Sequence, residues 1–179
     1  MKRSIALFLI VLALNSCGFG EGQKTVTVDN RYSISIPSFL IKTTSLNNDA
    51  SLQYQNTWKV FCVIVIDEPK SDFGKALVNN DLADLYSNDF TGYSELLLAG
   101  IERNFFIFQK PEFTETFVND MPARLVTIAG HIAGNGVFCS FAFIEGKDRY
   151  YQIMAWTSLD KKDQYKERMN KIIYSLIEL

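Results

Sequence analysis

The sequence has very few of the residues that carry most enzyme chemistry. It contains a single histidine, His131, so a serine–histidine–acid triad would have to use that residue. No Gly-x-Ser-x-Gly motif surrounds any serine, so the common signature of a hydrolase nucleophile is missing. A lone histidine near the end of an apolar run is typical of an ordinary strand position. We therefore expect no catalytic residue, and the alternative is a hydrolase with an unrecognised site.

Metal and phosphate motifs are missing as well. A zinc site would need Asp and Glu ligands at a metal-like spacing, which the sequence does not contain. Asp81, Asp84 and Asp89 lack the dense oxygen ligands and the glycine of a calcium loop, so we expect a solvated helix face there. Neither the Gly-x-x-x-x-Gly-Lys-Ser/Thr motif of phosphate-binding loops nor the Gly-x-Gly-x-x-Gly motif of dinucleotide-binding domains occurs after a predicted strand. We expect no metal and no cofactor.

Two further absences concern partners. The 18 Lys and Arg residues are balanced by 20 Asp and Glu residues, and no block of like charge occurs. Because a nucleic-acid surface needs clustered cations, we expect no nucleic-acid partner. No apolar run after Leu14 is long and charge-free enough to span a bilayer as a helix, which takes roughly 20 residues.

The first residues have the three parts of a secretion signal. Lys2 and Arg3 are followed by an apolar run over residues 4–14, which is too short to span a bilayer. The next residues, Leu14-Asn15-Ser16-Cys17, resemble the lipobox of bacterial lipoproteins. This resemblance implies cleavage between Ser16 and Cys17 and attachment of acyl chains to Cys17. The alternative is an ordinary signal peptide with a chance cysteine.

The lipoprotein resemblance also implies a location in the cell envelope. Gly18 stands where Asp commonly retains such proteins in the inner membrane, so we expect the outer membrane, on its periplasmic face rather than the cell surface. We expect a signal peptide over residues 1–16, a lipidated cysteine with a glycine-rich tether over residues 17–24, and one domain over residues 25–179. Two or three acyl chains hold a protein firmly, and the mildly acidic chain predicts no further attraction to anionic lipid.

The domain has the composition of a well-packed globule, with 47% hydrophobic and 13% aromatic residues. Alternation and apolar runs predict strands over residues 24–29, 32–37, 52–55, 58–66, 112–118, 123–132, 137–145 and 149–157. Asn56-Thr57 and Gly146-Lys147 are expected as turns. Asn135-Gly136 is the strongest hairpin signal, because both residues tolerate positive φ.

Helical spacing follows in two places. Apolar residues recur at steps of three and four from Val78 to Ile101, with a weak middle that divides the segment into two helices. Asp72 is the expected cap of the first helix, and Asp160 is the expected cap of a C-terminal helix. That last helix has one apolar stripe, formed by Tyr165, Met169, Ile172, Ile173 and Leu176.

Two side-chain questions stay open at this level. Cys62 and Cys139 lie inside apolar runs, where buried thiols are expected, although an oxidising envelope permits a disulfide. The aromatic run NFFIF at residues 104–108 is expected mainly in the core, with a groove or contact face as the alternative.

The whole pattern resembles the PsbP-like proteins, a fold shared by the photosystem II subunit PsbP and the Ran-binding Mog family. The resemblance rests on YSISIP, VNDMPARLVTIAG, YYQIMAWT and IIYSLIEL, and it covers residues 25–179. Leu176 replaces the phenylalanine usual near the end. The resemblance implies an α+β fold in which helices flank an antiparallel sheet in an α/β/α sandwich. It also implies a protein-binding or accessory role without a shared catalytic set.

These observations predict a lipid-anchored, non-catalytic envelope protein that binds a protein or small ligand of unknown identity. The expected partners are the membrane, through acyl chains on Cys17, and an unknown protein. A structural or stress-response lipoprotein without a fixed ligand is a further alternative.

Overall fold

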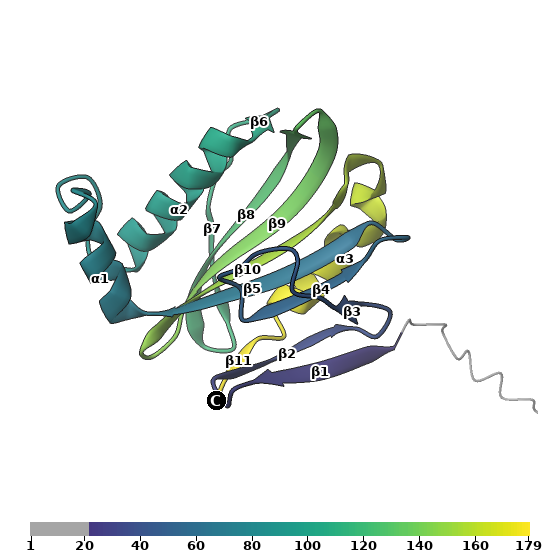
Figure 1. The fold of residues 1–179 in the computed structure, drawn as a ribbon, viewed down its shortest axis with the longest axis horizontal. Helices are drawn as coiled ribbons and strands as arrows, with labels where there is room; N and C mark the ends of the chain where they lie inside the picture. The colour runs from purple at the N-terminus through teal and green to yellow at the C-terminus, as the bar shows by residue number, and fades with distance from the viewer. Residues whose placement is uncertain (1–21) are drawn as a thin grey trace, which may run out of the picture.

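The computed structural model describes residues 22–179 (Figure 1). The expected signal peptide, the Ser16–Cys17 cleavage site and the tether up to residue 21 lie outside these residues. No helix within residues 22–179 is long and apolar enough to cross a membrane. β1 begins at Gln23, two residues before the expected start of the domain.

Eleven strands and three α-helices make up the described chain. The strands are β1 (Gln23–Val28), β2 (Tyr32–Pro37), β3 (Ile41–Lys42), β4 (Leu52–Asn56), β5 (Phe61–Pro69), β6 (Phe106–Ile107), β7 (Thr114–Val118), β8 (Met121–Ile132), β9 (Asn135–Glu145), β10 (Arg149–Ser158) and β11 (Ile177–Glu178). The helices are α1 (Lys70–Asn79), α2 (Phe90–Asn104) and α3 (Lys162–Ile173), the last preceded by a 3-10 turn, Leu159–Lys161.

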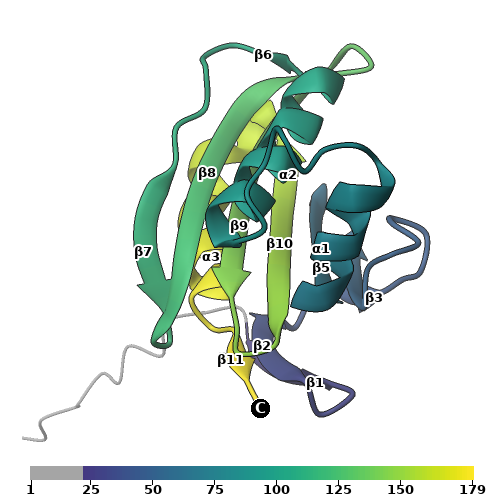
Figure 2. The same ribbon diagram turned by 90° about the vertical axis from the view of Figure 1, so that its left-hand side faces the viewer.

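The main sheet is antiparallel and follows the order β3-β4-β5-β10-β9-β8-β6, with β7 also paired to β8. α1 and α2 cover one face and α3 covers the other (Figures 1 and 2). The expected α/β/α sandwich is therefore confirmed, and β8, β9 and β10 form an antiparallel meander within it.

Alternation along the central strands explains the two layers of core. On β9, Phe141 and Phe143 pack with α1 and α2, whereas Ala142 and Ile144 pack with α3. Successive side chains of a strand point to opposite faces, so an uninterrupted apolar run is buried on both sides. The predicted stripe of the last helix is buried as expected, with Leu176 just beyond its end.

A second, smaller sheet was not predicted. β1 pairs β2, and β11 pairs the other edge of β2, so the two first strands stand apart from the main sheet. The buried side chains of β2 nevertheless join the same core as α3. A fully buried carboxylate, Asp67, connects the sheets: its Oδ2 lies 3.1 Å from Arg31 Nη1 and 2.7 Å from Arg149 Nε.

The helix boundaries correct two predicted caps. α1 begins at Lys70 directly after Pro69, and Asp72 lies in its first turn, where it accepts a 2.8 Å hydrogen bond from Lys75. Asp160 lies in the 3-10 turn before α3. The division of the first helical segment into two helices is confirmed, and the Asp89 side chain caps α2 by accepting a 2.9 Å bond from the Gly92 N–H.

The predicted Asn135-Gly136 turn is wrong. These residues pair with Ile132 and His131 inside the β8–β9 ladder, and Ala133 and Gly134 form the turn with φ values of 48° and 83°. The long pairing of β8 with β9 therefore outweighs the local turn signal. Gly136 has a packing role instead, because a Cβ there would lie 3.2 Å from Leu159 Cβ.

The β4–β5 connection is longer than the two residues expected. It spans residues 57–60, and β5 begins at Phe61 rather than at Trp58. From Phe61 on, β5 lies between β4 and β10 as the apolar run predicted. Trp58 is left outside the sheet and is 93% exposed.

Candidate functional site

The strand pairing along the outer side of β8 has a gap. β6 and β7 both pair with this edge, β6 through Ile107↔Gly130 and β7 through Thr114↔Leu125. The segment that connects them, residues 108–113, leaves the strand between these two pairings (Figure 2). The middle of a long strand is thus without a paired strand on this side, and Thr127 at its centre is exposed.

The backbone groups of Thr127 point into this gap. The Ala129 carbonyl accepts a 3.0 Å hydrogen bond from the Phe108 N–H, so Ala129 directs its backbone groups toward the outer edge. In an antiparallel ladder, alternate residues direct both their N–H and C=O to the same side. Thr127 therefore offers one donor and one acceptor to an incoming extended chain, between the ends of β6 and β7.

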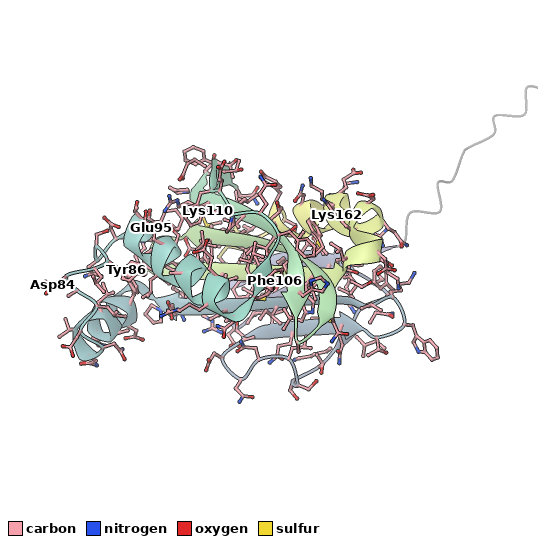
Figure 3. The ribbon with its side chains drawn as sticks, turned by 90° about the horizontal axis from the view of Figure 1, so that it is seen from above. Asp84, Tyr86, Glu95, Phe106, Lys110 and Lys162 are labelled. Atoms are coloured by element: carbon pink, nitrogen blue, oxygen red, sulfur yellow. The ribbon has the colours of Figure 1, made fainter. Side chains whose placement is uncertain are left out.

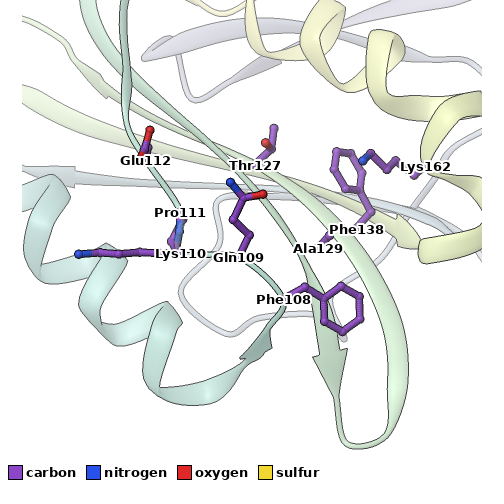
Figure 4. A pocket seen from close by; sticks show the side chains of 9 residues that line it. All are labelled: Phe108, Gln109, Lys110, Pro111, Glu112, Thr127, Ala129, Phe138 and Lys162. Carbon is purple, nitrogen blue, oxygen red and sulfur yellow. The ribbon is translucent and has the colours of Figure 1, made fainter.

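A groove of about 300 Å³ adjoins the gap. Its walls come from the 108–113 segment, β8, β9 and the start of α3: Phe108, Gln109, Lys110, Pro111, Glu112, Thr127, Ala129, Phe138 and Lys162. Figure 4 shows the Lys162 ammonium beside the Phe138 ring, where it lies 5.3 Å from the ring centre. The groove thus combines aromatic surface with the Lys162 cation and the Glu112 carboxylate, a mixture suited to a peptide or another amphipathic ligand, whereas the Lys110 ammonium points away from it over α2 (Figure 4).

The NFFIF run supplies the aromatic rim of this site. Phe105 packs into the core as predicted, but Phe106 is 73% exposed and Phe108 is also exposed (Figure 3). The core interpretation is therefore wrong for two of these phenylalanines, and the contact-face alternative describes them. Strand alternation at β6 could have identified Phe106, since its neighbours Phe105 and Ile107 face inward.

His131 belongs to the same rim. It is half-buried at the end of β8, with ring centres of Phe108 at 5.0 Å and Phe106 at 6.4 Å. The imidazole therefore packs against two exposed aromatic rings at the rim of the groove.

The predicted aspartate face does not form. Asp81 and Asp84 lie in the loop between α1 and α2, with Asp84 far from the sheet (Figure 3), so the helix-face interpretation is wrong. Asp89 caps α2, and the Gly92 N–H holds the pKa of its carboxyl below the usual range. Within residues 22–179, no three His, Cys, Asp or Glu side chains are grouped to hold a metal ion.

The two described cysteines are free thiols. Both pair with Trp156 of β10, Cys62 from β5 and Cys139 from β9, so a whole strand lies between them. Two strand spacings of about 4.8 Å put their Cα atoms roughly 10 Å apart, which is beyond the reach of a disulfide. Burial raises the pKa of the Cys62 thiol to about 11 and that of Cys139 to about 12. Both are protonated, poor nucleophiles near neutral pH.

Other buried ionisable groups serve the fold. Asp67 is paired with Arg31 and Arg149, as described above. Burial raises the pKa of Glu68, and a hydrogen bond from Tyr93 opposes that shift. None of these groups lines the groove at Thr127.

Comparison with known proteins adds evidence on the fold. No protein-family model matches the chain, and no curated protein matches it in sequence. Among solved structures, the cyanobacterial PsbP protein of Synechocystis sp. PCC 6803 is similar at 10% identity and TM-score 0.54, over 93% of this chain and 99% of that one. The Ran-binding protein Mog1p of Saccharomyces cerevisiae is similar at 13% identity and TM-score 0.52, over 88% and 95% of the two chains.

A third similar structure is that of a mycobacterial protein. LpqN of Mycobacterium tuberculosis, described as involved in cell envelope biogenesis, shares 9% identity at TM-score 0.54, over 88% of this chain and 90% of LpqN. At such low identity, these similarities establish a PsbP-like fold.

Proposed function

We propose that this chain is a lipid-anchored, non-catalytic accessory protein of the cell envelope whose domain binds an extended segment of a partner protein at the Thr127 gap. The observation that carries the proposal is the open edge of β8 beside the exposed rings of Phe106 and Phe108. Proteins normally cover such edges, because unpaired backbone groups bind any extended chain. An edge left open next to a groove is a site for strand addition.

The chemistry of the groove supports binding. Phe108 offers apolar contact, whereas Lys162 and Glu112 offer opposite charges that fix the direction of a peptide. Strand addition supplies affinity through backbone hydrogen bonds and specificity through side-chain pockets. The free thiols and His131 lie in packed surroundings that activate no nucleophile, which is why we place a hydrolase second.

The envelope location is supported by the first residues and by one similar structure. The Leu14-Asn15-Ser16-Cys17 sequence resembles a lipobox, which supports lipidation at Cys17. The similarity to LpqN, a protein involved in cell envelope biogenesis, is compatible with a location in the envelope. The similarity to Mog1p, a Ran-binding protein, is compatible with a binding role for the fold.

A backbone-specific substitution tests the site. Thr127→Pro removes the outward N–H without breaking a bond to β9, because proline is tolerated on an open edge. Thr127→Val keeps the N–H and the branched shape, and it is the matched control. A photo-crosslinking amino acid at Phe108 reports the partner in cells.

We expect one discrete crosslinked product with the natural Thr127 and with Thr127→Val, and its loss with Thr127→Pro. A crosslinker at Phe117, exposed on β7, controls for chance contacts. A product that persists in Thr127→Pro, or that also forms at Phe117, would contradict binding at the gap.

A further inference from the structure

A second exposed apolar pair lies at the opposite edge of the main sheet. Ile41 of β3 is 70% exposed and Trp58 of the β4–β5 turn is 93% exposed. Both line one shallow groove of about 220 Å³, so they are neighbours although they are far apart in the sequence. Neither takes part in the Thr127 site.

The fold holds Trp58 outward on a fixed turn. The Asn56 side chain accepts a 2.9 Å bond from the Lys59 N–H and donates a 2.9 Å bond to the Phe39 carbonyl. Val60 adopts a φ of 51°, a conformation that is costly for a β-branched residue. Such strain is retained where the surrounding structure enforces it, and it is concentrated at functional positions.

Two lysines adjoin this apolar pair in the sequence, and Lys42 lines the same groove. Lys42 follows Ile41, and Lys59 follows Trp58. Nζ of Lys59 lies 4.9 Å from the centre of the Phe39 ring, and the Arg168 guanidinium lies 5.3 Å from the same ring. Asp160, which lines a neighbouring groove with Val60, is an acidic side chain on this side. These three cations outnumber the one acidic side chain named here, although the whole chain has a formal net charge of -2.

The chain enters the domain close to the same surface. The Gly22 carbonyl accepts a 2.7 Å bond from the Ser38 N–H, three residues before Ile41. In Figure 1 the start of β1 and the start of β5 lie at the same end of the molecule. Cys17 lies five positions before Gly22, and a fully extended chain of that length spans at most about 18 Å. Acyl chains on Cys17 would therefore hold a bilayer within that distance of Gly22.

We propose that Ile41 and Trp58 insert into the headgroup region of an anionic bilayer while the adjacent cations contact lipid phosphates. We call the set Ile41, Lys42, Trp58 and Lys59 the membrane face. Tryptophan and lysine side by side suit this interface, because the indole ring sits at headgroup level and lysine extends to the phosphates. The inference rests on the proposed lipid anchor, which keeps the membrane face next to the bilayer.

The membrane face also orients the Thr127 site. β3 is at one edge of the main sheet and β8 is at the other, five strand spacings away. At about 4.8 Å per spacing this is roughly 24 Å. A domain resting on its membrane face therefore turns the Thr127 gap away from the lipid, toward partners in the aqueous compartment.

Tryptophan fluorescence tests this contact. The chain has two tryptophans, so Trp156→Phe leaves Trp58 as the single reporter. The full chain, purified from membranes, is reconstituted into vesicles of phosphatidylethanolamine and phosphatidylglycerol with brominated acyl chains. We expect the vesicles to shift Trp58 emission to the blue, the brominated lipid to quench it, and acrylamide to quench it less than in solution. The double substitution Lys42→Glu with Lys59→Glu should partly reverse all three changes.

The matched control places the reporter at the other end of the sheet. Trp58→Phe with Phe117→Trp and Trp156→Phe puts the single tryptophan on β7, and this residue should stay accessible to acrylamide. Quenching of both reporters by lipid would indicate nonspecific adsorption and overturn the proposal. A Trp58 reporter that shifts without vesicles, as concentration rises, would indicate self-association and overturn it too.

Mass spectrometry of Cys17 in the same preparation separates the two proposals. A lipidated protein whose Trp58 stays in water refutes the membrane face and leaves the anchor intact. An unlipidated protein whose Trp58 is quenched by lipid refutes the anchor and supports the membrane face. An unlipidated protein whose Trp58 stays in water refutes both.

Discussion

Asp67 of β5 and Arg149 at the start of β10 form an ion pair with 2.7 Å between Oδ2 and Nε, and the Asp67 side chain is fully buried. Arg31, from the β1–β2 turn, contacts the same oxygen at 3.1 Å. Asp67 therefore joins three segments, and it is one of the polar connections between the small sheet and the main sheet, beside the hydrogen bond from Tyr151 to Glu178. Removing one partner of a buried pair leaves charges without compensation.

We predict that Asp67→Asn lowers the free energy of unfolding by about 3 kcal/mol, because two guanidinium groups then face a neutral amide. Urea denaturation measures this change. Asp72→Asn is the matched control, since Asp72 pairs with Lys75 on the surface and should leave the urea midpoint unchanged. Equal effects of the two substitutions would show that the buried pair has no special role.

Arg124 fixes α2 and β7 to the main sheet. Its Nη1 donates a 2.6 Å bond to Ser94 of α2, its Nε donates a 2.7 Å bond to Glu115 of β7, and its guanidinium lies 3.8 Å from the Phe113 ring centre. We predict that Arg124→Ala costs about 2 kcal/mol through lost charged hydrogen bonds and ring contact. Hydrogen exchange should accelerate in α2.

The exposed Arg103, at the end of α2, provides the control for Arg124. Arg103→Ala should change neither the stability nor the exchange of α2. Protection of α2 that is the same in both variants would contradict the role given to Arg124.

The position of the β8–β9 turn, at Ala133 and Gly134, can be tested by substitution. Ala133 has a φ of 48°, a left-handed conformation that disfavours alanine but suits asparagine. Ala133→Asn creates Asn-Gly at the observed turn and should stabilise the protein by about 1 kcal/mol. Asn135→Thr, within the observed strand, should not destabilise it. Loss of stability in Asn135→Thr with no gain in Ala133→Asn would instead support the Asn135-Gly136 turn.

The buried thiols predict loss of stability in alkali. An ordinary thiol ionises near pH 8.5, whereas burial holds the pKa of Cys62 at about 11 and that of Cys139 at about 12. Above pH 8.5 the unfolded chain therefore binds fewer protons than the folded chain, so stability falls as pH rises, by at most about 1.4 kcal/mol per pH unit for each thiol. Urea denaturation between pH 8 and pH 10 measures this slope.

Cys62→Ser should make that alkaline slope shallower, because the half-buried Cys62 no longer titrates. Burial also raises the pKa of Tyr32, Tyr93 and Tyr151, which adds to the loss only at higher pH. An unchanged slope in Cys62→Ser below pH 10 would contradict the raised thiol pKa.

The sequence predicts the layers of this fold well because its periodicities are strong. The alternation in YSISIP and the stripe from Tyr165 to Leu176 each point one set of side chains at the core, and both sets are buried. The expected α/β/α sandwich follows, since apolar runs such as residues 61–66 need cover on two faces. Placing β1 and β2 in a separate sheet requires long-range pairing, such as that of β11 with β2, which no local pattern records.

The candidate sites were harder to predict for a physical reason. Phe106 and Trp58 read as core residues because their type is usually buried, and only the pairing of β6 and the length of the β4–β5 turn expose them. The gap at Thr127 arises from two strands that share one edge of β8. The lipidation site at Cys17, in contrast, is a prediction from local spacing alone, and it lies outside the described residues.

Incorporation of a labelled fatty acid at Cys17 tests the central claim, a lipid-anchored envelope protein, most directly. Cells that express the full chain are grown with an alkyne-tagged palmitate, and the label on the purified protein is measured for the natural chain, Cys17→Ala and Cys62→Ala. We predict strong labelling of the natural chain and of Cys62→Ala, and none of Cys17→Ala. Labelling that persists in Cys17→Ala, or that is absent from the natural chain, would contradict the lipid anchor.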